Sequence, residues 1–297
     1  MASTTAMHMP PNRTILGESE GVIFYPAEYN LSYEFPFESR FDPMPVTIYM
    51  QRYWTLSIWL SLVYVLGIYL GRHVMRDRQA FDLNTQLTMW NAVLAVFSIM
   101  GAIRMFPEFY HVLTEYGFEY SMCNASFAMC KTSSFWTFMF ALSKVVEFGD
   151  TVFIVLRKRP IIFLHWYHHI TVLIYNWHAF KDHTAAGRWF QIMNYTVHAF
   201  MYSYYALRSV GHKFPKFVPM LITMMQLAQM IVGCIIVGNS YRIQSQGGHC
   251  QQTYQNLYFS FAIYFSYFLL FANYFYQAYM KRGGKHNGHV KQANKAD

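Results

Sequence analysis

Charged residues are scarce in this sequence. Asp, Glu, Lys and Arg make up 13% of its 297 residues, whereas hydrophobic residues make up 54%. About a quarter of the residues of a soluble domain are charged, so this composition excludes an ordinary soluble protein. Seven apolar segments come near the ~20 residues that a transmembrane helix needs, at 54–75, 86–106, 134–156, 161–180, 187–208, 217–239 and 256–280. The sequence therefore predicts an all-α, polytopic membrane protein with seven transmembrane helices.

Acidic residues are outnumbered by basic ones, which gives a formal net charge of +8. The basic residues concentrate in alternate connections and in the C-terminal tail. They are Arg72, Arg76 and Arg78; Arg157, Lys158 and Arg159; Arg208, Lys213 and Lys216; and Lys281, Arg282, Lys285, Lys291 and Lys295. Positively charged connections stay in the cytosol, so we expect a cytosolic C-terminus and a lumenal N-terminus across an odd number of spans.

The charge therefore reflects orientation and attraction to anionic membrane lipid. No motif for binding nucleic acid accompanies it. We divide the chain into a loosely ordered lumenal segment at 1–50, a seven-helix domain at 51–280 and a basic cytosolic tail at 281–297.

Cysteine is also rare, with four residues and no CxxC pair, which argues against a structural zinc site. Cys123 and Cys130 follow the second predicted helix, and Cys250 follows the sixth. Both connections lie on the predicted lumenal side, where a disulfide can form, but three cysteines leave one over. Glycosylation sequons on that same side begin at Asn12, Asn30 and Asn124.

Polar residues in the predicted spans are not scattered. His165, His168 and His169 lie at spacings i, i+3 and i+4, so a helix places their rings on one face. Polar groups are costly in hydrocarbon, and a cluster of them indicates a functional site. Most polar residues of four predicted helices lie at similar depth, counted at ~1.5 Å per residue. They are Lys144, Glu147 and Asp150; the three histidines; Asn194, His198, Met201 and Tyr205; and Thr223, Gln226 and Gln229.

These residues predict one water-excluded chamber that opens toward the cytosol. Each of them alone has an ordinary structural explanation. Lys144 and Glu147 can neutralise each other on one helix, and the glutamines can join helices by hydrogen bonds.

Histidine can serve as a nucleophile, a general base or a metal ligand. One alternative is a membrane di-iron desaturase or hydroxylase, because HxxHH occurs in such enzymes, but no second histidine box exists here. A non-enzymatic seven-helix receptor would not need the polar chamber, and a transporter would show inverted repeats or broken helices. In the remaining hypothesis a neutral imidazole attacks a thioester and forms an acyl-imidazole, which the apolar chamber protects from water.

Four motifs on four successive predicted helices resemble the ELO family of very-long-chain fatty acid elongases. They are KVVEFGDTVFIVLRKRP from Lys144, LHWYHHITVL from Leu164, MNYTVHAFMYSYYALR from Met193 and TMMQLAQ from Thr223. The resemblance implies a narrow substrate tunnel enclosed by the seven helices and a 3-oxoacyl-CoA synthase of the endoplasmic reticulum membrane. Such an enzyme condenses long-chain acyl-CoA with malonyl-CoA to 3-oxoacyl-CoA, CO2 and CoA. This is the first step of the fatty acid elongation cycle, and we expect it to need no metal and no redox cofactor.

The resemblance also assigns roles to residues. It makes His168 the nucleophile that accepts the acyl group and places His198 at the reacting centre. His165 and His169 complete the box as acid/base partners or as hydrogen-bonded support. The expected substrate-binding residues are Lys144, Glu147, Asp150, Asn194, Tyr205, Gln226 and Gln229.

Further expectations concern the mouth of the chamber, a disulfide, the C-terminal tail and the partners. Arg157, Lys158 and Arg159 lie at the chamber mouth, where they can bind CoA phosphates, although orientation explains each of them equally well. The resemblance favours a disulfide between Cys123 and Cys250. The tail departs from a dilysine-type retrieval signal, because Lys295 lacks its lysine partner. We also expect other elongation-cycle enzymes as partners, and we include a homo-oligomer among the expected assemblies.

Overall fold

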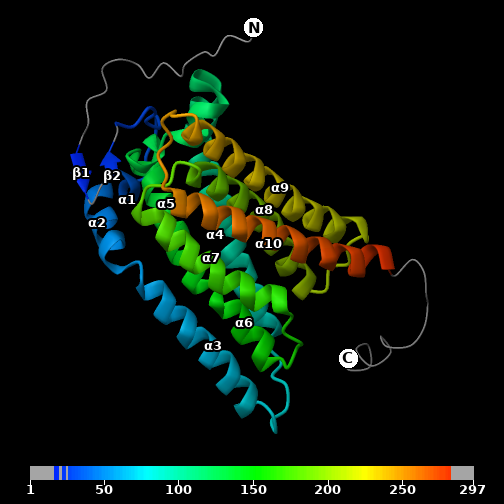
Figure 1. Ribbon diagram of the computed structural model, residues 1–297. Helices are drawn as coiled ribbons and strands as arrows, with labels where there is room; N and C mark the ends of the chain where they lie inside the picture. The colour runs from blue at the N-terminus through cyan, green and yellow to red at the C-terminus, as the bar shows by residue number, and fades with distance from the viewer. Residues whose placement is uncertain (1–16, 20–21, 25, 282–297) are drawn as a thin grey trace.

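A bundle of helices makes up most of the chain in this computed structural model, which describes residues 17–19, 22–24 and 26–281 (Figure 1). The elements are β1 (Gly17–Ser19), β2 (Val22–Phe24), α1 (Pro36–Ser39), α2 (Pro43–Tyr53), α3 (Leu56–Val74), α4 (Asn84–Cys123), η1 (Ser126–Ala128), α5 (Lys131–Val146), α6 (Phe148–Leu156), α7 (Phe163–Lys181), α8 (Gly187–Ser209), α9 (Phe217–Ser245), α10 (Tyr254–Phe275) and η2 (Tyr276–Met280). The strands β1 and β2 form one short antiparallel pair. Apart from this pair, the regular structure of the described chain is helical.

All seven apolar segments predicted from the sequence lie in helices. Within the described residues, four helices are long and apolar enough to cross a membrane, namely α3, α4, α9 and α10 with its continuation to Met280. The third predicted segment is divided at Glu147 into α5 and α6, and each piece is short. Both α7 and α8 have the length but carry the polar residues of the predicted chamber. The helices thus identify a multi-pass membrane protein, with four clear spans where the sequence predicted seven.

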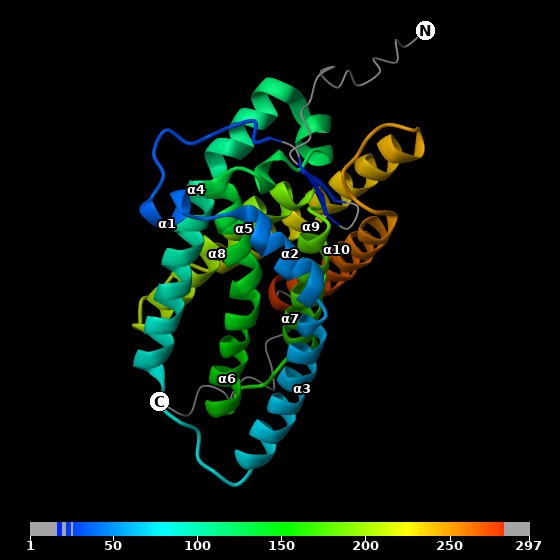
Figure 2. The same ribbon diagram turned by 90° about the vertical axis from the view of Figure 1, so that its left-hand side faces the viewer.

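The helices differ in how they pack. Helix α3 runs along one side of the bundle, beside α6 and α7 (Figure 2). Helix α4 lies along α8, and Gly101 of α4 leaves room for the ring of Tyr195 of α8, which a Cβ atom at Gly101 would overlap. The largest group of buried apolar residues lies among the ends of α4 and the helices α7 to α10. The largest apolar core therefore lies on the side of the bundle formed by α7 to α10.

The helix that contains the second predicted span extends well beyond that span. Helix α4 continues through Pro107 to Cys123, although the sequence predicted a span only at 86–106. A proline inside a helix removes one backbone hydrogen bond but does not always end the helix. The backbone turns instead at Gly117, whose φ of 83° favours glycine.

The segment before the first span also differs from the expectation of loose order, because α1 and α2 form within it. Glu38 of α1 is fully buried. It accepts hydrogen bonds from Nε of Arg104 at 2.9 Å, Nε1 of Trp136 at 2.7 Å and its own helix's Phe35 N at 2.9 Å. Burial raises the pKa of this carboxyl, but these hydrogen bonds outweigh it and hold the pKa below 4.5. The cluster fastens the N-terminal segment to α4 and α5.

A disulfide joins Cys123 to Cys250, and Cys130 is a buried free thiol. Beside this bond, the buried Arg188 pairs with Glu108 at 2.9 Å and donates to the carbonyl of Asn124 at 2.8 Å. These contacts tie together the end of α4, the start of α8 and the connection before α10.

The structure corrects one of the three glycosylation predictions. Asn124 is buried, and its side chain accepts a hydrogen bond from the backbone N of Ser126 at 2.9 Å, so it cannot carry a glycan in this fold. Asn30 is exposed, as a glycosylated residue must be. Asn12 lies outside the described residues.

We expect Arg104→Met to destabilise the protein, because it leaves the Glu38 carboxylate buried without its cation. Removing one partner of a buried ion pair costs about 3 kcal/mol. The midpoint of thermal unfolding in detergent measures the effect. Arg242→Met is the matched control, because the pair of Arg242 with Glu119 is about half-exposed and should contribute under about 1 kcal/mol.

The pH dependence follows from the lowered pKa of Glu38. A lowered carboxyl pKa stabilises the fold above the unfolded value of 4.5, and this contribution is lost as the pH falls through the folded value. The difference between wild type and Arg104→Met should therefore shrink below pH 4.5. Equal unfolding midpoints for the two proteins at neutral pH would contradict this account of the cluster.

Candidate functional site

Two cavities meet at the centre of the bundle. The outer cavity has a volume of about 780 Å³ and is lined mainly by α6 to α10, and the inner cavity, of about 80 Å³, extends among α5, α7, α8 and α10. Four residues line both cavities: His168, Asn194, Gln229 and Met230. A molecule that passed from one cavity to the other would therefore pass His168.

The three histidines of the box have different surroundings on α7. His165 contacts Oγ1 of Thr151 through its Nε2 at 2.8 Å, and its ring lies 4.5 Å from the ring of His169. His169 is buried, whereas His168 faces the junction of the cavities. Among the described residues, no side chain or backbone group forms a hydrogen bond with the ring nitrogens of His168. A substrate can therefore reach this imidazole, and the other two histidines line the outer cavity only.

Tyr267 of α10 contacts both the ring and the backbone of His168, and it was not among the residues predicted from the sequence. The ring of Tyr267 lies 4.9 Å from the ring of His168, and the Tyr267 hydroxyl donates to the carbonyl of His168 at 3.2 Å. The same hydroxyl lies 2.6 Å from Oγ1 of Thr171. A signal was present, because residues 264, 267, 271 and 274 are all aromatic at helical spacing.

A buried ion pair lies next to the junction. Nζ of Lys144 donates to Oε1 of Glu147 at 2.8 Å and to Oδ1 of Asn194 at 2.9 Å. The same carboxylate oxygen lies 3.8 Å from Nδ1 of His198. Lys144 and Glu147 are 1% and 3% exposed, so each charge depends on the other for compensation. The structure thus brings together predicted residues of two of the predicted spans, 134–156 and 187–208.

Asp150 lies in the wall of the outer cavity. One of its oxygens accepts from Nε1 of Trp90 at 2.6 Å, and the other accepts from the hydroxyl of Tyr202 at 2.8 Å. Neither partner was singled out from the sequence. Both oxygens are engaged, so the structure gives Asp150 a role in joining α6 to α4 and α8.

The other predicted lining residues also border the outer cavity. Tyr205 is 46% exposed there, whereas Gln229 is buried. The side chain of Gln226 contacts the sulfur of Met201 at 3.6 Å. The wall at this level is therefore polar on α8 and α9, as the sequence predicted.

The three basic residues after α6 do not all face the outer cavity. Arg157 and Arg159 line the outer cavity, and Arg157 also donates to Asn84 at 2.9 Å. Nζ of Lys158 instead donates to the backbone carbonyls of Arg76 and Arg78, at 3.0 and 2.9 Å, in the connection before α4. Arg208 at the end of α8 lines the outer cavity as well and was not among the predicted site residues. The mouth thus holds three arginines, and Lys158 has a structural role.

Within the described ranges, no three His, Cys, Asp or Glu side chains are arranged to hold a metal ion. The donors that do converge are one accessible imidazole, a second imidazole beside a carboxylate, and an ammonium group. Such a set suits acyl transfer, in which an imidazole acts as nucleophile or base.

Comparison with known proteins agrees with this chemistry. Residues 49–287 match the model of the family described as ELO: GNS1/SUR4 family. The chain is 54% identical to the Putative fatty acid elongase 3 of Caenorhabditis elegans, over 86% of this chain and 81% of that protein. It is 47% identical to the Very long chain fatty acid elongase 6 of Drosophila melanogaster, over 86% and 82% of the two chains. The human protein of that name is 41% identical, over 89% and 97%.

The buried ion pair generates a prediction. Lys144→Met should lower the thermal unfolding midpoint, because the change leaves Glu147 buried and uncompensated at a cost of about 3 kcal/mol. The double variant Lys144→Met/Glu147→Gln should be more stable than Lys144→Met alone, since no bare charge remains. Lys181→Met serves as a control, because the pair of Lys181 with Asp182 is more exposed. A double variant less stable than Lys144→Met would show that Glu147 is not held by this lysine.

Proposed function

The chain belongs to the ELO: GNS1/SUR4 family and is a fatty acid elongase, and we propose that His168 is the residue on which its reaction takes place. The enzyme is a 3-oxoacyl-CoA synthase: it condenses a long-chain acyl-CoA with malonyl-CoA and releases CO2 and CoA. Neither the di-iron enzyme nor the seven-helix receptor receives support from the family match. The observation that carries the proposal is the place of His168, in the wall shared by the two cavities.

In the first half-reaction, the acyl chain lies in the inner cavity and CoA lies in the outer one. A ring nitrogen of His168 attacks the thioester carbonyl, a C–N bond forms and the C–S bond breaks. The proton lost by the imidazole neutralises the thiolate, and free CoA departs. The enzyme is left as an acyl-imidazole, whose reactive carbonyl is kept from water by the enclosed site.

In the second half-reaction, malonyl-CoA occupies the vacated outer cavity. Its carboxylate leaves as CO2, and the resulting enolate carbon attacks the acyl carbonyl. The new C–C bond forms as the C–N bond to His168 breaks, and the ring regains a proton from His198, which we assign as the donor and which then takes a proton from solvent. The place of His198 supports this assignment, because its side chain lines the same outer cavity as His168. The covalent step lets two CoA substrates use one cavity in turn.

The remaining site residues position these groups. His165 and His169 support the box, and Lys144, Glu147 and Asn194 fix α5 and α8 around the junction. Asp150, Tyr205, Gln226 and Gln229 complete the polar wall of the outer cavity. No step in this scheme changes an oxidation state, so we propose a reaction that uses neither a metal nor a redox cofactor.

We further propose that the protein lies in the endoplasmic reticulum membrane with seven spans, a lumenal N-terminus and a cytosolic C-terminus. The basic connections at the mouth of the outer cavity support this orientation. The disulfide and the exposed Asn30 suit the opposite, lumenal side. The products require further enzymes of the elongation cycle as partners, and a homo-oligomer stays an expectation.

The covalent acyl-enzyme intermediate can be detected by its mass. Incubation with acyl-CoA alone should add one acyl mass to the wild-type protein, and malonyl-CoA should remove it. His168→Ala should gain no such mass and should lose condensation, while its unfolding midpoint stays near that of wild type. Intact-mass spectrometry measures the adduct, and a chelator should leave wild-type activity unchanged. A wild-type enzyme that condenses both substrates without ever acquiring the mass would instead have His168 as a base in a ternary complex.

The second prediction concerns CoA binding. The double variant Arg157→Gln/Arg159→Gln should raise the KM for acyl-CoA by about tenfold, because two cations that can pair with CoA phosphates are lost. The kcat should change little, since neither residue reaches the junction. Lys158→Gln is the matched control and should keep the KM, because its ammonium group binds backbone carbonyls outside the cavity. Equal KM changes in both proteins would mean that the basic cluster acts only through its total charge.

A further inference from the structure

The inner cavity is polar at its far end. Near His168 its wall contains apolar and aromatic residues such as Val172, Phe140 and Ile263, together with Asn194 and Gln229 of the junction. Asn176 lies eight residues further along α7, about 12 Å away along the helix axis. The wall away from His168 contains several side chains with polar groups, namely Ser134, Thr137, Tyr175, Asn176, His183, Thr184 and Gln191. The methyl end of a plain fatty acyl chain cannot form hydrogen bonds with these polar side chains.

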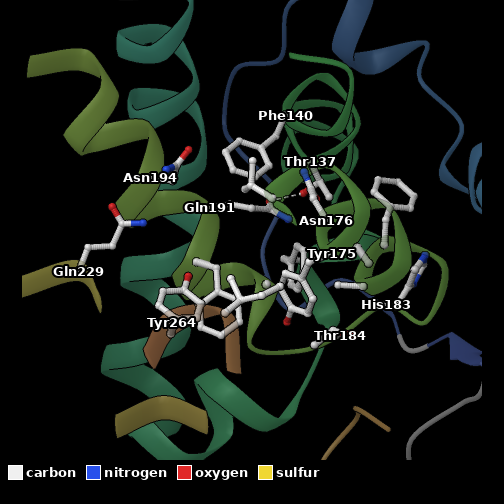
Figure 3. Close-up of a pocket in the computed structure, with 18 of the residues that line it drawn as sticks. Thr137, Phe140, Tyr175, Asn176, His183, Thr184, Gln191, Asn194, Gln229 and Tyr264 are labelled. Atoms are coloured by element: carbon white, nitrogen blue, oxygen red, sulfur yellow. Dashed lines mark hydrogen bonds between the residues drawn. The ribbon is translucent and has the colours of Figure 1, made fainter. Parts of the chain in front are cut away.

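Three of these side chains have a buried polar atom without a hydrogen-bond partner in the described chain: Tyr175, Asn176 and Thr184. Oγ1 of Thr137 donates to Oε1 of Gln191 at 2.8 Å, and Nε2 of His183 contacts Oγ1 of Thr47 at 2.7 Å. In contrast, Nδ2 of Asn176 and Oγ1 of Thr184 have no hydrogen-bond partner within the described chain, although the residues are 91% and 97% buried. Figure 3 shows Asn176 beside the Thr137–Gln191 pair and Thr184 at the lower edge of the same pocket. Buried donors without partners are costly, so this end is built to meet a polar group.

The far end is also uncharged. Among the described residues, those that line the inner cavity include no Asp, Glu, Lys or Arg. Burial lowers the pKa of His183 to about 4, so this imidazole is neutral at physiological pH. A carboxylate or an ammonium group would find no counter-charge here and would be costly to bury. A hydroxyl group fits, because it is neutral and can accept a hydrogen bond from Nδ2 of Asn176 or donate one to Oγ1 of Thr184.

We propose that the inner cavity accepts acyl chains that carry a hydroxyl group at or near the terminal carbon, bound by Asn176 and Thr184. The inference rests on the proposed function, since it takes the inner cavity as the site of the acyl chain. It deepens that function in two ways. Hydroxylated acyl-CoAs become preferred substrates at the length that reaches this end. Plain chains of that length meet unpaired polar groups, so the same residues limit how long a plain chain can be.

The experiment compares a series of saturated acyl-CoAs of increasing length, each paired with its terminally hydroxylated analogue. The measured quantity is the ratio of kcat/KM for the hydroxylated chain to that for the plain chain, obtained for each length. In wild type the ratio should rise above one at the length that reaches Asn176. Both Asn176→Leu and Thr184→Val should lower that ratio by about tenfold, the usual effect of one lost buried hydrogen bond. Both should also allow longer plain chains to react.

Thr132→Val is the matched control. Thr132 also has a buried hydroxyl without a partner in the described chain, but it lines neither cavity. The control should keep the wild-type ratio, which separates binding at the cavity end from a general effect of removing a buried hydroxyl. A lowered ratio in Thr132→Val equal to that in Thr184→Val would overturn the assignment.

The experiment distinguishes failure of the hydroxyl-binding inference from failure of the proposed function. Wild type that elongates plain chains but discriminates against every hydroxylated analogue would overturn the inference and leave the elongase reaction intact. A wild-type protein that condenses neither series would instead contradict the proposed site. Should the cavity variants not fold, the wild-type ratio alone decides, because a ratio below one at every length excludes a hydroxyl site.

Discussion

The ion pair between Lys144 and Glu147 is the interaction on which the rest of the site depends. Two charges buried in a membrane protein must compensate each other, and removing either leaves the other at a large cost. Lys144 also binds Asn194, and Glu147 lies beside His198, so the pair connects α5 with α8. Glu147 marks the division between α5 and α6. This neutral unit keeps two helices in register beside the histidine box of α7.

The place of His168 explains why one imidazole can serve two substrates. It lies in the wall that the two cavities share, with the polar outer cavity on one side and the narrow inner cavity on the other. A chain attached to it can stay in the inner cavity while the CoA that delivered it departs. The packing of Tyr267 on its ring and the bond from Tyr267 to its backbone limit how far the ring can move. The site therefore combines an accessible nucleophile with a rigid setting.

Polar groups outside the junction divide into those that hold the fold and those that face a cavity. Glu38 and Arg188 are buried and fully engaged, and they fasten the N-terminal segment and the connection near the disulfide. Asn176 and Thr184 are also buried, but each has a polar atom without a partner in the described chain, and both line the inner cavity. A protein interior rarely leaves donors unpaired without a reason, and this difference separates structural polar groups from ones suited to a ligand.

The sequence by itself determined the membrane class, the helical segments and the residues of the chamber, because apolar length and polar residues at helical spacing are local properties. The motif resemblance supplied the reaction and the family. Only the tertiary structure decided what each polar group does, since that depends on contacts between distant segments. In the folded protein, Asp150 accepts hydrogen bonds from Trp90 and Tyr202, and Lys158 donates to backbone carbonyls. Asn124 is buried. The tertiary structure also ordered α1 and α2 through Glu38, and it placed α10 against His168, because packing across the bundle has no period that a single sequence can show.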